Sequence, residues 1–189
     1  MRRPCIRLFL AAVTTATALV AGCATLSESE CRRADWHQIG ERDGANGHRA
    51  DRYESHREAC LEYGLRPNPE RYLAGRDLGL RRYCVLDNAV REGLAGRNYE
   101  GVCPPSISNS FAELNRVAYA VYKARKEVES LGNKIDSLES ERRSDKTSKD
   151  RHKEIRDEIR ATERKLDRAR DDLRYREMDL NRAVSMTPR

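Results

Sequence analysis

Cysteine and histidine are the residue types that most readily carry chemistry in this chain of 189 residues, which holds six cysteines and four histidines. The cysteines lack the short C-x-x-C spacing of zinc sites and of thioredoxin-like redox centres. In an oxidising compartment an even set of cysteines is typical of disulfides instead. The compartment therefore decides how these residues are interpreted.

The N-terminal residues predict export and a lipid anchor. Basic residues at positions 2, 3 and 7 precede an apolar stretch over residues 8–20, which is shorter than the roughly 20 residues that span a bilayer. The segment Leu19-Val20-Ala21-Gly22-Cys23 then resembles the lipobox of bacterial lipoproteins. This resemblance implies a signal peptide over residues 1–22 and acylation of Cys23, with membrane lipid as a partner. Ala24, in place of aspartate, favours the outer membrane, facing the periplasm, over the inner membrane.

The cysteines that remain after the signal peptide and Cys23 are set aside allow three disulfide pairings. The midpoint of the first two lies in the glycine-containing segment 44–47, and that of the last two lies beside segment 93–96. Because glycine favours chain reversal, each pair is expected to join the open ends of one hairpin. Each disulfide should contribute about 3 kcal/mol to stability. We therefore predict the pairs Cys31–Cys60 and Cys84–Cys103.

The sequence predicts an all-α fold, because no segment alternates apolar and polar residues as a strand does. Residues 23–34 are expected to form a lipidated tether, and residues 35–109 a small Gly-rich head stapled by the disulfides. Capping residues predict helices within the head. They run from Asp35 to about Asn46, over residues 50–63, from Asn68-Pro69 to about Gly79, and from Asp87 to Gly96.

Two pairs of glycines recur at helical spacing, Gly40 with Gly44 and Gly75 with Gly79, and each pair follows an aromatic residue. One interpretation is a ligand cleft. The favoured interpretation is a close crossing of two smooth helices, because a helical glycine costs about 1 kcal/mol and usually has a packing reason. The recurrence also suggests a weak internal duplication.

The order of Cys, Gly and aromatic residues carries a resemblance to a known family. It rests on the segments Cys31-x3-Asp35-Trp36-x2-Ile39-Gly40-x2-Asp43-Gly44, Tyr72-x2-Gly75-Arg76-x2-Gly79-Leu80 and Gly101-Val102-Cys103-Pro104. Over about residues 23–125 the chain resembles bacterial lipoproteins known only as domain of unknown function 2799. That family has no established activity, so the resemblance implies no catalytic role.

The C-terminal part predicts long helices. From Leu114 to Leu138 and from Ile155 to Ala183, apolar residues recur at steps of three and four, with Arg176 as the one charged member. This pattern is typical of coiled-coil seams. We predict that residues 110–187 form an antiparallel coiled-coil hairpin that begins at a capping box on Ser110 and reverses at residues 145–149. One continuous helix that pairs between molecules is the alternative, because the break lacks glycine and proline.

Motifs and charge argue against an enzyme and against nucleic acid as a partner. No histidine lies in a metal-binding or nucleophile motif, so we expect the histidines in solvent or at helix ends. We expect no catalytic residue, no metal and no cofactor. The net charge of +6 includes the arginines of the signal peptide, and the basic residues of the C-terminal part alternate with acidic ones, as on a solvated helix face.

The expected function is that of a non-enzymatic, lipid-anchored envelope protein with a structural or interaction role. Its expected partner is an envelope protein at the C-terminal helices. The alternative is a module that binds peptidoglycan or lipopolysaccharide through aromatic and basic side chains of the head. The candidate ligand-binding residues are Trp36, Asp43, Tyr72, Arg76 and Tyr99, with Tyr83 as a further aromatic.

Overall fold

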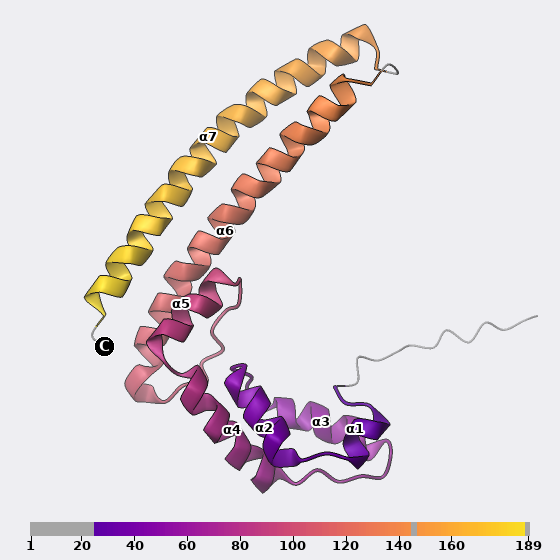
Figure 1. The fold of residues 1–189 in the computed structure, drawn as a ribbon, viewed down its shortest axis with the longest axis vertical. Coiled ribbons are helices and arrows are strands. Elements are labelled where there is room, and N and C mark those ends of the chain that lie inside the picture. Colours follow the sequence, from indigo (N-terminus) through magenta and orange to yellow (C-terminus); the bar gives the residue numbers. More distant parts are fainter. Residues whose placement is uncertain (1–24, 145–146, 188–189) are drawn as a thin grey trace, which may run out of the picture.

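The computed structural model describes residues 25–144 and 147–187, which contain helices and no strand, as predicted. Short helices form a head, and two long helices extend from it side by side (Figure 1). The helices are α1 (Glu28–Arg32), α2 (Trp36–Ala45), α3 (Arg52–Leu61), α4 (Pro69–Tyr83), α5 (Leu86–Leu94), α6 (Pro105–Arg142) and α7 (Lys149–Met186).

The predicted signal peptide over residues 1–22 and Cys23 lie outside the described residues. Among the described helices, none is long and apolar enough to cross a membrane.

Capping side chains start α2 and α4 as the sequence predicts. Asp35 accepts hydrogen bonds from the first turn of α2, and Asn68 does so for α4. The predicted end of α4 at Gly79 was wrong, because Gly79 packs against α2 and the helix continues to Tyr83. The predicted cap at Asp87 was also wrong, since α5 begins at Leu86 and Asp87 lies in its first turn.

The predicted tether over residues 23–34 is not a free linker where it is described. Ser27 and Glu30 form a capping box that starts α1. The side chains of Leu26 and Cys31 are buried, and Cys31 forms a disulfide with Cys60 of α3. The chain is therefore fixed on the head from residue 25 onward.

The four paired glycines lie in one crossing between α2 and α4, and they confirm the favoured interpretation. A Cβ on Gly40 would lie 2.0 Å from the carbonyl oxygen of Tyr72, and a Cβ on Gly75 would lie 1.9 Å from that of His37. Each oxygen belongs to the residue three positions before the partner glycine. The two helices therefore run parallel and meet backbone to backbone across a local two-fold relation. The recurrence of glycine pairs, which suggested a duplication, thus reflects the symmetry of this one helix crossing.

A true structural repeat relates the α2–α4 pair to the α5–α6 pair. A Cβ on Gly44 would clash with the carbonyl oxygen of Arg76, and a Cβ on Gly93 would clash in the same way with that of Asn115. The backbone N–H of His48 donates to the carbonyl oxygen of Asp43, five residues earlier. In the second pair the backbone N–H of Arg97 donates in the same way to the carbonyl oxygen of Glu92. Gly47 and Gly96 both have positive φ, near 73° and 79°, and each lies against a tyrosine ring of the second helix, Tyr83 or Tyr122.

The chain thus contains two similar units. In each, a helix that ends in Asp/Glu-Gly-x-x-Gly packs in parallel on a second helix. One disulfide closes each unit, in the predicted pairing of Cys31 with Cys60 and Cys84 with Cys103. The Cα atoms are 5.5 and 5.6 Å apart, which is the usual separation for a disulfide.

The second unit continues into a pair of antiparallel helices (Figure 1). The predicted capping box at Ser110 is not formed, because α6 begins earlier, at Pro105, and proline suits the first helical position. At 1.5 Å per residue, each helix of 38 residues is roughly 55 Å long. Buried apolar residues hold the pair together near its base and near its tip; they include Val117, Val121, Leu138, Ile155, Ile159 and Leu180.

One side chain near the tip bridges the two helices, and sequence reasoning missed it. Arg151 of α7 donates from Nε and Nη2 to the two carboxylate oxygens of Glu141 on α6, at 2.7 and 3.0 Å. It also donates to Glu158, about two turns further along α7. In this structure α6 and α7 thus lie side by side and antiparallel, and the coiled-coil packing of their apolar seams stays a prediction.

Candidate functional site: a buried network next to the N-terminus

The structure separates the five candidate ligand-binding residues. Asp43 and Tyr72 meet in the interior of the first unit, where Arg76 is also buried, while Trp36 packs against the core beside them. Tyr99 lies in the other unit, against Phe111. The five residues therefore do not lie on one common surface, and ligand binding by any of them stays a prediction.

The aromatic rings of the head serve its two cores. Tyr72 has no exposed surface, and Tyr83 is 4% exposed. Neither ring offers a face on which a sugar could stack. Tyr99 uses its hydroxyl to accept from the backbone N–H of Cys103, at 2.8 Å, and so helps to shape the loop before α6.

Asp43 is the centre of a buried network that joins three helices to the start of the described chain. Its Oδ2 lies 2.8 Å from Nε2 of His56 on α3 and accepts from the hydroxyl of Tyr72 on α4 at 2.9 Å. The other ring nitrogen of His56, Nδ1, lies 2.8 Å from Oγ1 of Thr25. Arg52 approaches the second oxygen of Asp43, at 3.5 Å. We call Thr25, Asp43, His56 and Tyr72 the buried network.

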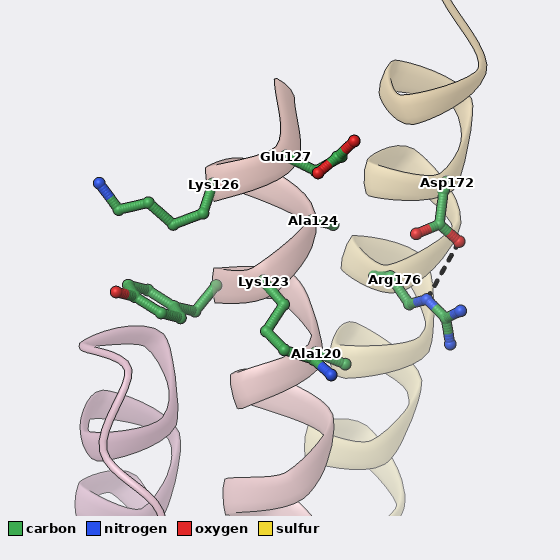
Figure 2. A pocket seen from close by; sticks show the side chains of 8 residues that line it. Ala120, Lys123, Ala124, Lys126, Glu127, Asp172 and Arg176 are labelled. Atoms are coloured by element: carbon green, nitrogen blue, oxygen red, sulfur yellow. Dashed lines mark hydrogen bonds and ion pairs between the residues drawn. The ribbon is translucent and has the colours of Figure 1, made fainter. Parts of the chain in front are cut away.

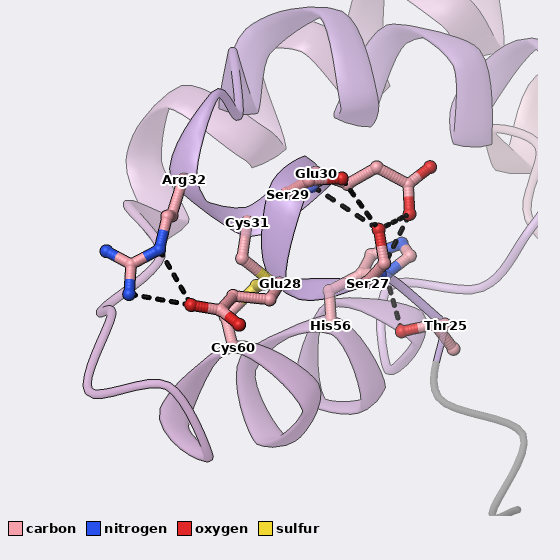
Figure 3. Close-up of a disulfide and its surroundings, with 9 residues drawn as sticks. All are labelled: Thr25, Ser27, Glu28, Ser29, Glu30, Cys31, Arg32, His56 and Cys60. Atoms are coloured by element: carbon pink, nitrogen blue, oxygen red, sulfur yellow. Dashed lines mark hydrogen bonds and ion pairs between the residues drawn. A yellow bond between two sulfur atoms is a disulfide. The ribbon is translucent and has the colours of Figure 1, made fainter.

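The prediction that the histidines lie in solvent or at helix ends was wrong for His56, which is 2% exposed. Its two hydrogen-bond partners come from two other segments, so no local spacing in the sequence reveals them. One signal was present, because His56 lies four residues before Cys60 and shares its face of α3. Figure 3 shows His56 beside the disulfide, with Thr25 next to its ring.

The ionisation of the network follows from its contacts. Burial alone would raise the pKa of Asp43, but hydrogen bonds from His56 and Tyr72, with the charge of Arg52, hold that pKa below its usual value. The carboxylate is thus ionised at neutral pH and only accepts. Nε2 of His56 therefore carries the proton toward Asp43, and in the neutral ring Nδ1 accepts from Thr25. Burial and the charge of Asp43 raise the pKa of Tyr72, which stays protonated.

Thr25, His56 and Asp43 have the residue types of a hydrolytic triad, yet their setting suits support rather than reaction. His56 and Asp43 are enclosed, and Tyr72 occupies the same carboxylate oxygen as His56. Within the described residues, no group of His, Cys, Asp and Glu is arranged to hold a metal ion. The network ties residue 25 to the interior of the head.

A substitution of Tyr72 by Phe tests the ionisation of the network. At pH 7 it should lower the free energy of unfolding by about 2 kcal/mol, because it removes a hydrogen bond to a charged group. The unfolded tyrosine has a pKa near 10, and the folded pKa lies above that value. The contribution of Tyr72 is therefore complete below pH 10 and should decline by about 1.4 kcal/mol per pH unit above it.

Urea denaturation of both proteins at pH 8 and pH 11 measures this change. The difference in the free energy of unfolding between the two proteins should be smaller at pH 11 than at pH 8. A difference that stays constant would show that Tyr72 titrates normally in the folded protein.

A second feature lies between the long helices, where an open groove of about 610 Å³ interrupts the apolar contacts. Figure 2 shows Ala120 and Ala124 on α6 facing Arg176 of α7, whose Nε donates to Asp172 at 3.1 Å. The predicted charged member of the seam is thus paired within its own helix. Small residues opposite it leave room for its long side chain.

Comparison with known proteins gives one match. Residues 35–119 match the model of a family described as protein of unknown function (DUF2799). No curated protein and no solved structure matches the chain. The matched segment covers α2 to α5 and the first half of α6, so Cys31 and the rest of the long helix pair lie outside it.

Proposed function

We propose, on the premise that this chain belongs through residues 35–119 to the DUF2799 family of proteins of unknown function, that it is a non-enzymatic lipoprotein of the bacterial envelope. In this proposal Cys23 is acylated and anchors the protein to the periplasmic side of the outer membrane. The head holds the long helix pair at a set position relative to that anchor, and the helix pair binds another envelope protein.

The observation that carries the proposal is the attachment of Thr25 to the buried network. Thr25 follows Cys23 by two residues, which span at most about 7 Å. Acyl chains on Cys23 would thus enter the membrane directly beside the head. Two or three such chains anchor a protein stably, since each buried CH₂ contributes about 0.8 kcal/mol.

The position of the long helix pair supports the proposal. The described chain begins at the head beside α1 and α3, and the reversal between α6 and α7 lies at the opposite end of the molecule (Figure 1). With the head at the membrane surface, the tip is able to reach a partner some tens of ångströms away. Exposed Tyr175 and Met178 lie on the part of α7 near the head, so they offer surface for a contact along the helix pair and not at its tip.

The alternative of a glycan-binding head loses its main support, because Tyr72 and Tyr83 are core residues. The buried network gives no support to an enzymatic role, because its reactive side chains, Asp43 and His56, are buried.

Replacing Cys23 by Ala tests the anchor. The protein should take up no fatty acid and should accumulate as an uncleaved precursor, because the thiol is the acylated group in this proposal. Labelling of cells with an alkyne-bearing fatty acid, followed by gel analysis, measures both effects. The matched control is Cys5→Ala, which alters another cysteine of the N-terminal segment and should leave labelling unchanged. A Cys23→Ala protein that still incorporates the label would contradict the proposal.

A further inference from the structure

A groove of about 710 Å³ lies at the junction of the two repeat units. One wall is the C-terminal half of α4, and the other is the loop before α6 with the first turn of that helix. The Cys84–Cys103 disulfide lies among the lining residues, and Leu80, Val102 and Ile107 supply apolar surface. The charged lining residues are Arg76, Asp77 and Arg81.

The repeat shows what the fold requires at the position of Arg76. Its Nε and Nη2 both donate to the carbonyl oxygen of His48, at 3.1 and 2.9 Å. The equivalent residue of the second unit is Asn115, whose Nδ2 donates to the carbonyl oxygen of Arg97, the equivalent of His48, at 3.0 Å. An uncharged amide is thus sufficient for this structural contact.

Arg76 adds a positive charge that the contact does not need. The residue is 8% exposed, and its hydrogen bonds within the described part of the chain go to that one carbonyl oxygen. No carboxylate in the described ranges lies within ion-pair distance of it; its neighbour Asp77 forms no ion pair with it. Arg76 therefore has no counterion within these ranges, and its guanidinium has N–H donors beyond the two in use.

The groove therefore combines a poorly compensated cation with an apolar surface. Arg81 is exposed, forms no ion pair within the described residues and adds a second positive charge at the rim. With Arg76 and Arg81 positive and Asp77 negative, the lining has a net charge of +1, which matches a singly charged anion. Guanidinium groups bind carboxylates through paired N–H donors.

We propose that this groove binds a single-chain amphiphile with a carboxylate head, such as a fatty-acid anion. The carboxylate pairs with Arg76 and Arg81, and the chain lies along Leu80, Val102 and Ile107. This site is separate from the proposed anchor, and its occupation does not depend on acylation of Cys23.

The test uses the full chain in isolated envelopes and three photoreactive probes. The first is dodecanoic acid with a diazirine on its chain, the second is the matching alcohol, and the third is the matching alkyl phosphate. After irradiation, the protein is purified and cross-linked peptides are mapped. The acid should label peptides from residues 73–107 at least tenfold more than the alcohol, since a charged hydrogen bond is lost with the alcohol.

Two variants locate the carboxylate. Arg76→Asn keeps an amide like that of Asn115 and should reduce labelling by the acid about tenfold. Arg81→Gln alters an exposed residue without disturbing the core, and it should reduce labelling by a smaller factor of about three. This variant keeps the proposal testable even if Arg76→Asn impairs folding. Arg168→Gln, on the exposed surface of α7, is the matched control and should have no effect.

Equal labelling by the acid and the alcohol, or acid labelling unchanged in Arg81→Gln and in a folded Arg76→Asn protein, would overturn the proposal. Stronger labelling by the phosphate than by the acid would overturn the assignment of a carboxylate ligand. Circular dichroism and non-reducing gels report whether each variant retains its helices and disulfides.

Discussion

An alanine in place of Gly75 should lower the free energy of unfolding by about 3 kcal/mol or more, which is a large fraction of the stability of a small domain. The added Cβ would lie 1.9 Å from the carbonyl oxygen of His37. The obstacle is backbone, so no side chain is able to rotate away and α2 and α4 must separate. Separation also weakens the contact between Tyr72 on α4 and Asp43 on α2.

Two further variants show whether the helix crossing is the cause. Gly132→Ala is the matched control, because Gly132 lies inside α6 with nothing within 4 Å of its Cβ position. It should raise stability by up to about 1 kcal/mol, the difference in helix propensity. Gly40→Ala combined with Gly75→Ala should cost less than the sum of the single changes, since one separation of the helices accommodates both methyl groups.

Urea denaturation followed by circular dichroism measures each free energy. An ordinary surface substitution changes the free energy of unfolding by no more than roughly 0.5 kcal/mol. If Gly75→Ala changed it by no more than that, the helices would not cross this closely.

Local signals in the sequence were sufficient for much of the head. Asp35 and Asn68 define helix starts by side-chain caps, and such caps depend on neighbouring residues alone. The paired glycines predicted a close crossing, since a helical glycine needs a packing reason. The disulfide pairing followed from the position of each pair of cysteines about a glycine-containing reversal.

The parts that sequence reasoning missed depend on contacts between distant segments. His56 contacts Thr25 and Asp43, which lie 31 and 13 residues away in the sequence, and its spacing of four residues from Cys60 was the one local sign that it is buried. The repeat was hidden because its two copies differ in length: a whole helix, α3, lies between the paired helices of the first unit, while a loop replaces it in the second. Tyr72 and Tyr83 look like binding residues in a sequence so rich in arginine, but a small head needs large side chains for its core.

Removal of the Cys31–Cys60 disulfide is expected to have the second large effect. Replacing both cysteines by Ala should lower the free energy of unfolding by about 3–4 kcal/mol, because the bond closes a loop with a sequence separation of 29 residues. Cys60 is fully buried, so the lost side-chain contacts add to this cost. Both cysteines are changed together so that no free thiol remains.

The effect should also be local. Without this disulfide, the buried side chain of Leu26 and the hydrogen bond between Thr25 and His56 are left to hold α1 on the head. A helix of five residues is marginal by itself. Hydrogen exchange should therefore become faster in residues 25–33, and more slowly exchanging amides in α6 and α7 should keep their protection, since no cysteine lies in that pair of helices.

The matched variant removes the other disulfide, Cys84–Cys103, by the same double replacement. Its loop is shorter, with a separation of 19 residues, so the expected cost is about 3 kcal/mol. Protection should now fall at the contact between α5 and the base of α6, while residues 25–33 remain protected. If the two units of the repeat are closed independently, each loss stays within its own unit. Loss of protection in both units after either replacement would show that the head unfolds as one body and that its two disulfides have no separate roles.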